Sequence, residues 1–292
     1  MVAAIIPVWK QNFGTEISRL ERALFKYKVV SIDTEFPGFI RNTPRDGSET
    51  ERYKDLKFNV DALKLIQLGI TLSDERGTIF GTWEFNFCFD LGEDLYVLES
   101  VEFLKKNGLD FDKHARDGIH MSGFAKIFTA VLAKHRDLFW VTFHGLYDLA
   151  YTLGLITMAP LPNSVLGFTT LLGSVFGRVV DVKYMARFCK GLCGGELGLS
   201  KLASILRIER KGGAHQAGSD SLLTALVFAK INMVFPIHQL LYLGSLYGIQ
   251  PRISPTITPP PLPSCCIPQI NNVPPFLYGM ARNQDFMYYI PT

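Results

Sequence analysis

Two carboxylates, Asp33 and Glu35, stand two residues apart at the end of an apolar run, in the stretch VVSIDTEFPGF (29–39). Side chains at i and i+2 of a β-strand point to the same face, so a strand here would project both acids together. Like charges that close raise each other's pKa unless a cation neutralises them, and a divalent metal ion would do so. Acidic residues also gather at turns, and Pro37 and Gly38 indicate one, so these two carboxylates alone favour the turn.

Asp148 lies just beyond a second apolar run, LFWVTFH (138–144), at the opening of an expected helix. Open α/β sheets commonly place their ligands beyond the ends of such buried strands. An acid in the first turn of a helix also complements the helix dipole, so Asp148 alone is only a candidate. His144, at the end of the run, is interpreted as a hydrogen-bonded core histidine.

The stretch GGAHQAGSDSLLT (212–224) carries a histidine on a glycine-rich loop and an acid five residues later. Ser219 is expected to cap the helix that Asp220 opens. A rigid helix would thus hold a metal-binding acid, while the loop would hold His215 as a mobile base. A histidine in a glycine loop is also common on protein surfaces, so His215 is a functional candidate only in combination with the acidic residues.

The composition indicates a globular protein of 292 residues, 48% apolar, with a formal net charge of +3. A charge so near balance excludes a protein that holds nucleic acid by bulk electrostatics alone, and any phosphate contacts must be local. The start, MVAAIIPVWKQNF, shows no secretory leader pattern, and no apolar run reaches the length of a membrane helix. We expect no membrane association.

The pattern along the chain predicts strands and helices of an α/β protein with a mixed sheet. A helix capped by Thr15 leads into the first strand, and residues 64–74 and 82–90 form an antiparallel hairpin. Residues 100–134 are helical, and a strand at 138–144 precedes another helix. After a less regular segment at 158–176, a strand and a helix at 177–190 precede a long helix that ends before Pro236. Helices on both faces of the sheet follow from this order.

The chain divides into a predicted domain at 1–250 and a proline-rich tail at 251–292, which holds ten of the sixteen prolines. Such a tail is typical of disordered or extended chain. The cysteines form no paired C-x-x-C set, which suits a reducing compartment. Cys189 and Cys193, four residues apart on an expected helix, are interpreted as buried thiols rather than metal ligands.

Taken together, Asp33-x-Glu35, Asp148 and His215-x4-Asp220 resemble the DEDD exonucleases of the histidine subgroup. More narrowly, the blocks SIDTEFPGF, LKLIQLGIT, WEFNF, WVTFH with a following YD, DVKYM and HQAGSDSLLT resemble the Caf family of poly(A)-specific ribonucleases. That family is the nuclease subunit of the eukaryotic deadenylase complex built on a Not-type scaffold. The resemblance covers residues 6–248 and implies an RNase H-like fold.

The resemblance also implies a phosphodiesterase with two divalent metal ions, Mg²⁺ or Mn²⁺, which oxygen ligands favour. By family likeness, Asp33 bridges both ions, Glu35 and Asp220 complete one metal site, and Asp148 holds the other. His215 would take the proton from the attacking water. Asp181 is interpreted as a hydrogen-bonding residue, because no metal partners follow it in the sequence.

The substrate that the resemblance implies is the 3′ poly(A) tail of messenger RNA, shortened 3′→5′ with release of AMP. Phe36, Phe39 and Arg41 are candidates for the RNA groove, with core packing the simpler role for Phe36 and a solvated turn for Arg41. The implied partners are poly(A) RNA, a Not-type scaffold and a second deadenylase subunit, and the implied location is the cytoplasm and nucleus.

The chain departs from the family pattern in three places. Gly145-Leu146 stands where the family usually has Ser-Gly, CGGELGL (193–199) is slightly expanded, and the tail has no counterpart. A bulkier residue two positions before Asp148 could reshape the mouth of the site. A non-catalytic adaptor that bridges other subunits, and a related exonuclease on DNA or short oligoribonucleotides, therefore stay as alternatives.

Overall fold

The computed structural model describes residues 4–44 and 46–254 and contains one six-stranded mixed sheet, ordered β1-β4-β3-β2-β5-β6. The strands are β1 (Ile5–Val8), β2 (Val29–Glu35), β3 (Gln67–Ser73), β4 (Ile79–Asn86), β5 (Phe139–Thr142) and β6 (Arg178–Asp181). β3 runs antiparallel to both of its neighbours, and the other pairs are parallel. The predicted mixed sheet and hairpin are confirmed, whereas β1 was not predicted.

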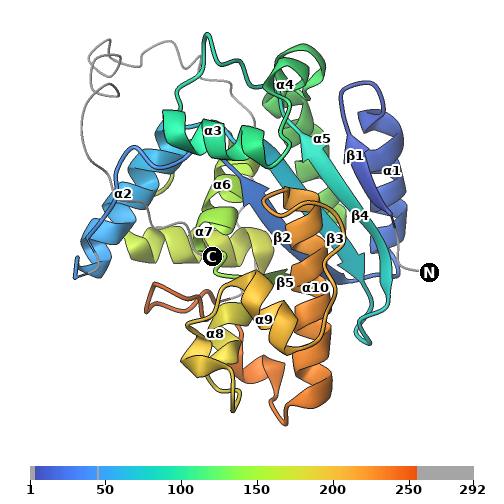
Figure 1. Ribbon diagram of the computed structural model, residues 1–292, viewed down its shortest axis with the longest axis vertical. Helices are drawn as coiled ribbons and strands as arrows, with labels where there is room; N and C mark the ends of the chain where they lie inside the picture. The colour runs from blue at the N-terminus through green and yellow to red at the C-terminus, as the bar shows by residue number, and fades with distance from the viewer. Residues whose placement is uncertain (1–3, 45, 255–292) are drawn as a thin grey trace.

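Helices pack on both faces of the sheet, as predicted. The helices are α1 (Phe13–Leu24), α2 (Glu49–Ala62), α3 (Leu98–Lys106), α4 (Phe111–Asp117), α5 (Met121–Lys134), α6 (Leu146–Thr157), α7 (Val165–Phe176), α8 (Val182–Ala186), α9 (Leu199–Ile205) and α10 (Ala217–Val234), with short 3-10 segments η1 (Cys193–Gly195) and η2 (Gln239–Tyr242). Figure 1 shows α10 lying across one face of the sheet, with α8 and α9 beside it.

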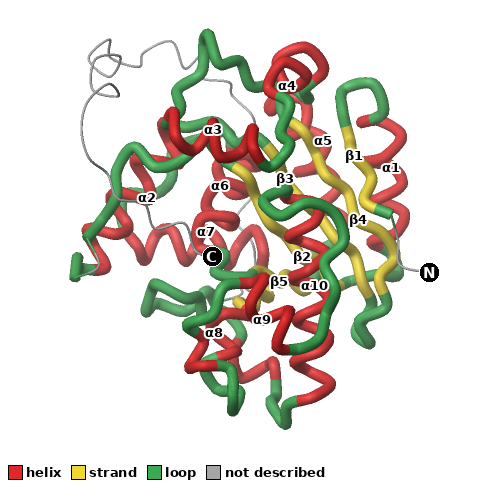
Figure 2. Tube along the Cα trace, viewed as in Figure 1, coloured by secondary structure: helices red, strands yellow, loops and turns green. Residues whose placement is uncertain are grey.

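Alternate side chains along each strand face opposite sides of the sheet, and each side has its own hydrophobic core. Ile32, Ile70 and Trp83 face the core that α1, α2, α5, α6 and α7 cover, whereas Val29 and Val141 face α8, α9 and α10. Figure 2 shows the strands as one layer between these helices. Asp33 and Glu35 share the parity of Val29, so both acids face α10.

Helix α10 is buried on nearly every side, because the sheet covers one side and the α8–α9 region covers the other. After its polar first turn its sequence is mostly apolar with no single apolar face, which is typical of an enclosed helix. The closest approach is at Gly69 of β3, where an added Cβ would lie 1.8 Å from the backbone oxygen of Ala217. Glycine at position 69 therefore lets the start of α10 lie directly on the sheet.

Several sequence predictions are wrong in detail. Helix α1 begins at Phe13 rather than after Thr15, and α10 begins at Ala217, so Ser219 lies inside the helix rather than capping it. The helical stretch 100–134 is three helices, and α7 occupies the segment expected to be loose. Cys189 is buried as predicted, but Cys193 is exposed.

The proline-rich tail lies almost wholly outside the described residues, since the description ends at Ser254. Its first residues pack on the domain: Ile253 is buried and its backbone N–H donates to the carbonyl of Gly244 at 2.8 Å. Within the described part of the chain, no helix is both long enough and apolar enough to cross a membrane.

The close contact at Gly69 predicts a strong effect of one methyl group. Gly69→Ala would push α10 off the sheet, so we expect the free energy of unfolding to fall by at least about 2 kcal/mol. Urea denaturation followed by circular dichroism measures the change.

Gly123→Ala is the matched control, because Gly123 lies in α5 and an added Cβ there meets no atom within 4 Å. Alanine should stabilise this helix by up to about 1 kcal/mol. Equal midpoints for the Gly69 variant and the wild-type protein would contradict the packing argument.

Candidate active site

Asp33 and Glu35 lie on β2 itself, opposite Gly69 and Gln67 of β3. The strand therefore continues through both acids, and the turn follows it at Gly38, where φ is +102°. The strand alternative is confirmed, and both carboxylates point to the face covered by α10. Each side chain is only partly exposed.

The start of α10 is hydrogen-bonded to the same face of the sheet. The backbone N–H of Ala217 donates to Oε1 of Gln67 at 3.2 Å, and the N–H of Gly218 donates to Oε2 of Glu84 at 3.1 Å. These bonds satisfy two of the N–H groups that the first turn of a helix leaves free. They also hold Asp220, in that first turn, over β2.

Sequence reasoning missed the two strand residues that hold α10. Gln67 is 4% exposed, and Glu84 is largely buried, so neither is a solvated surface group. Burial raises the pKa of Glu84, and the Gly218 hydrogen bond partly offsets this. A signal for them was present in the sequence: both are polar residues within predicted strands, with the parity that places them on the same face as Asp33.

His215 lies next to the acids, on a loop in which its own backbone has a strained, left-handed conformation. Its φ is +57°, its backbone N–H donates to Oδ2 of Asp220 at 3.0 Å, and its ring meets the Phe103 ring of α3 at a centroid distance of 4.6 Å. Burial lowers the pKa of His215, which favours the neutral imidazole. A neutral imidazole can accept a proton.

Asp148 reaches the site from the first turn of α6 and is 8% exposed. Its Oδ1 accepts hydrogen bonds from the backbone N–H of Thr34, at 2.9 Å, and from the Thr34 hydroxyl, at 2.5 Å. Burial raises the pKa of Asp148 to about 7, and the two Thr34 hydrogen bonds oppose that rise. Thr34 thus ties α6 to β2 between the two strand acids.

Asp181 has the hydrogen-bonding role predicted for it. This buried carboxylate accepts backbone N–H groups from His144 at 2.8 Å, Lys183 at 2.9 Å and Tyr247 at 2.9 Å. His144 itself is half-buried with φ at +59°, and burial lowers its pKa to about 4. Its ring packs edge-on against Tyr247.

The carboxylates of the site repel one another in a poorly solvated place. Burial raises the pKa of Asp33 well above its ordinary value, and three neighbouring carboxylates, led by that of Asp148, raise it further. Burial raises the pKa of Glu35 in the same way, with Asp220 as the next contributor. So many mutually repelling acids call for bound cations.

A divalent ion fits the donor set found here. One carboxylate oxygen of Glu35, one of Asp220 and a ring nitrogen of His215 all lie within 4.8 Å of one another. The Asp148 carboxylate lies near enough to raise the pKa of Asp33, but neither residue is part of this closest group. The carboxylate oxygens of this set are the donors that suit Mg²⁺ or Mn²⁺.

Sequence reasoning also missed the cation that faces the acids. The Arg210 guanidinium forms an ion pair with Oδ1 of Asp220 and donates to the hydroxyls of Ser219, at 3.2 Å, and Ser200, at 2.9 Å. Its charge lowers the pKa of Asp33 and Glu35, against the larger effects that raise them. Arg210 could have been predicted from the need for a positive charge near so many acids.

The candidate groove residues follow Glu35 in the chain, and Phe36 and Phe39 belong to an aromatic cluster. Phe36 packs against Tyr151 at a centroid distance of 4.6 Å and against Phe39 at 5.2 Å, and Phe39 meets Tyr147 at 4.9 Å. Exposed Arg41 lies over the Phe58 ring, 3.6 Å from its centroid.

Asn59, buried in α2, fixes the turn that carries Arg41. Its side-chain oxygen accepts the backbone N–H groups of Ile40 and Arg41, both at 2.9 Å, and its amide donates to the Arg41 carbonyl at 2.8 Å. The turn after β2 is therefore rigidly placed next to the site. Whether it contacts RNA stays a prediction.

The profile described as CAF1 family ribonuclease matches residues 8–121 and 120–228. The probable CCR4-associated factor 1 homolog 1 of Arabidopsis thaliana is 40% identical over 289 residues, which cover 95% of this chain and 79% of that protein.

Two solved structures share the fold. The Mg²⁺- and Mn²⁺-bound structure of S. pombe Pop2p has a TM-score of 0.77 and 38% identity, covering 84% of this chain and 99% of that one. A chain in the structure of the yeast NOT1 MIF4G domain co-crystallised with CAF1 has a TM-score of 0.73 and 26% identity, covering 84% of this chain and 96% of that one. The RNase H-like fold predicted from the sequence is confirmed.

The buried acids predict an unusual dependence of stability on pH. A carboxyl whose pKa is higher in the folded protein than in the unfolded chain binds protons more tightly when folded. Stability is then lost as pH rises through the interval between those values, which for Asp148 runs from 3.8 to about 7. The thermal midpoint of the metal-free protein should therefore fall between about pH 5 and about pH 7.5.

Asp148→Asn should weaken this fall and stabilise the metal-free protein at pH 7.5 by on the order of 1–3 kcal/mol. Thermal unfolding in EDTA measures it. Asp137→Asn is the control, because Asp137 is exposed, pairs with Lys28 and has a lowered pKa. A wild-type midpoint that rises across this range would contradict the account.

Proposed function

This chain belongs to the CAF1 family of ribonucleases, and from that membership we propose that it is an active 3′→5′ exoribonuclease that shortens poly(A) tails and releases AMP. The observation that carries the proposal is the convergence of Asp33, Glu35, Asp148, His215 and Asp220 from separate parts of the chain. The mutual repulsion of the four carboxylates is costly without bound cations, which is a reason to assign those four side chains to metal binding.

In the proposed site, the carboxylates of Glu35, Asp220, Asp148 and Asp33 would together hold two divalent ions. Bound in this way, a metal pair would neutralise charge on the attacking and leaving oxygens of the phosphodiester. The relative of known structure with bound Mg²⁺ and Mn²⁺ supports this assignment. In this chain, the Thr34 hydrogen bonds and the anchored start of α10 would keep the carboxylates in place.

His215 is the proposed general base. Its ring lies beside the Glu35 and Asp220 carboxylates, and its lowered pKa keeps it neutral at physiological pH. It would take the proton from the attacking water as the bond to the terminal nucleotide breaks. The contact with Phe103 orients the imidazole, and the backbone bond to Asp220 holds its loop in place.

The RNA would approach along the turn that follows β2. Phe36 and Phe39 offer aromatic surface for bases, and Arg41 offers a charge for the phosphate backbone. Phe36 is partly buried and packed on Tyr151, so Phe39 and Arg41 carry more of this proposal.

Activity on RNA tests the proposal directly. A 5′-labelled RNA ending in adenosines should lose nucleotides from its 3′ end with Mg²⁺ and stay intact with EDTA. Asp33→Asn and Asp220→Asn should each reduce the rate at least about a hundredfold while the fold is retained. Asp137→Asn, at an exposed position, should keep a near-normal rate.

The substrate class is tested by competition among oligo(A), mixed-sequence RNA and single-stranded DNA. The proposal expects oligo(A) to be shortened fastest. Faster degradation of DNA would favour a related exonuclease with the same chemistry, and an unchanged 3′ end under every condition would remove the enzymatic proposal.

A second candidate function is a scaffold-bound adaptor, favoured by the structural likeness to the chain co-crystallised with the NOT1 MIF4G domain. We expect this chain to bind a Not-type MIF4G domain with a Kd of about 1 µM or tighter, measured by calorimetry. A second deadenylase subunit would join through the same complex. Tight scaffold binding by a chain that neither binds Mn²⁺ nor degrades RNA would favour the adaptor.

A further inference from the structure

Arg210 occupies one oxygen of a carboxylate that the proposed function assigns to metal binding. Its guanidinium pairs with Oδ1 of Asp220, while Oδ2 accepts the backbone N–H of His215. The two side chains are 20% and 11% exposed, so solvent screens the pair only weakly. A metal ion that uses Asp220 must therefore share this carboxylate with a positive charge in contact with it.

The charge of Arg210 reaches beyond Asp220. Glu35 places a carboxylate oxygen within 4.8 Å of one from Asp220, so the positive charge in contact with Asp220 also attracts Glu35. A divalent ion would act on the same carboxylates in the same sense. Arg210 and the ion are thus alternative cations for one cluster of acids, and each weakens the binding of the other.

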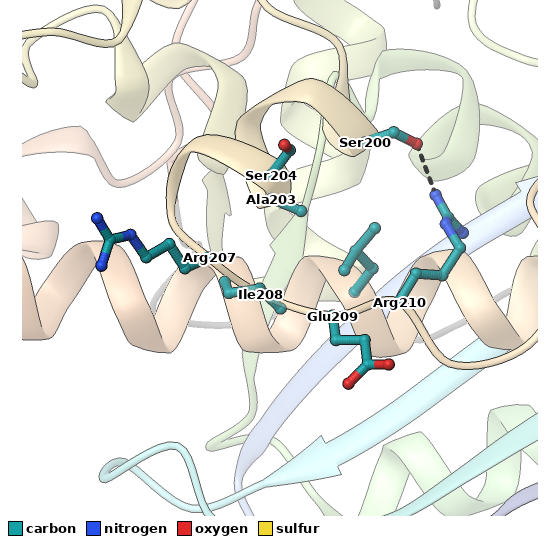
Figure 3. Close-up of a pocket in the computed structure, with 8 residues that line it drawn as sticks. Ser200, Ala203, Ser204, Arg207, Ile208, Glu209 and Arg210 are labelled. Atoms are coloured by element: carbon teal, nitrogen blue, oxygen red, sulfur yellow. Dashed lines mark hydrogen bonds between the residues drawn. The ribbon is translucent and has the colours of Figure 1, made fainter.

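A cavity next to Arg210 offers its side chain a second position, away from Asp220. Arg210 lies at the wall of this cavity of about 370 Å³ between α9 and α10, where Ser200, Ser204 and Arg207 are also found. Figure 3 shows Arg210 and Arg207 at opposite ends of this cavity, with Arg210 directed toward Ser200. The hydrogen bond from Nη2 to the Ser200 hydroxyl is made independently of Nη1, which faces Asp220.

We propose that Arg210 is a built-in counter-cation of the metal centre. It holds Oδ1 of Asp220 in the metal-free protein, competes with a divalent ion for that oxygen, and withdraws toward Ser200 when the ion binds. The inference rests on the proposed function, because it takes Asp220 as a metal ligand. It adds a residue, outside the acids and His215, that sets how tightly the centre binds metal.

Calorimetric titration of Mn²⁺ into the full-length chain tests this. Arg210→Gln removes the competing charge, and an adjacent cation typically shifts the equilibrium of a carboxylate at least tenfold, so Mn²⁺ should bind about tenfold more tightly. Without metal, the same variant should have a lower thermal midpoint than the wild-type protein. Arg210→Lys keeps the charge, so its affinity for Mn²⁺ should stay nearer to that of the wild type.

Arg207→Gln is the matched control, because it removes the same charge from the exposed end of the same cavity. It should change the affinity for Mn²⁺ by less than about twofold. Ser200→Ala gives a second test if Arg210→Gln fails to fold: without the hydroxyl that holds Nη2 on the α9 side, Arg210 should stay on Asp220, and Mn²⁺ should bind more weakly.

The outcomes separate the two claims. If the wild-type protein binds Mn²⁺ and Arg210→Gln binds it no more tightly, the counter-cation proposal is overturned and the proposed function stands. Unchanged or tighter binding by Ser200→Ala would count against it equally. If neither the wild-type protein nor Arg210→Gln binds Mn²⁺, the proposed metal-dependent function fails.

Discussion

The hydrogen-bonded contact between the start of α10 and the sheet is the constraint on which the site depends. Gln67 and Glu84 accept the first N–H groups of the helix, and the glycine at position 69 lets the backbones approach. Further along, Ser221 and Thr71 hydroxyls lie 2.9 Å apart. These polar contacts between the sheet and α10, which we call the polar seam, fix how α10 is rotated and how far it lies from the sheet. They therefore set the distance between Asp220 and the two acids of β2.

That seam also explains the composition of the segment AGSDS at 217–221. A helix that must lie so close to a strand needs small side chains on the buried side, and Gly218 meets this need against Ile5 and Glu84, whose atoms would lie within 3.0 Å of an added Cβ. Glycine and serine are poor helix formers, so tertiary contacts rather than intrinsic propensity hold this first turn. The site is assembled by packing between distant segments.

How far the sequence predicts this structure depends on whether a signal is local. Period-two alternation placed Asp33 and Glu35 on one face, and the family resemblance brought in the residues from distant segments. The start of α10 was misplaced because Ser219 carries a local capping signal that bonds from the sheet override. Helix α7 was missed because glycine and threonine interrupt its apolar pattern. Arg210 was missed because its pairing with Asp220 depends on the path of the loop between α9 and α10, which no local pattern predicts.

The departure at Gly145-Leu146 is a local repacking and not a loss of the site. A Cβ at position 145 would lie 2.1 Å from the Cβ of Thr142, so in this chain Thr142 fills the space that a serine side chain would need. Leu146 packs against the core beneath α6. Asp148 is positioned from the other side, by the backbone and hydroxyl of Thr34, and that support does not involve either changed residue. Because the carboxylate is held from β2, the entry to α6 can change in sequence while the acid keeps its place, which weakens the argument for a non-catalytic adaptor based on this substitution.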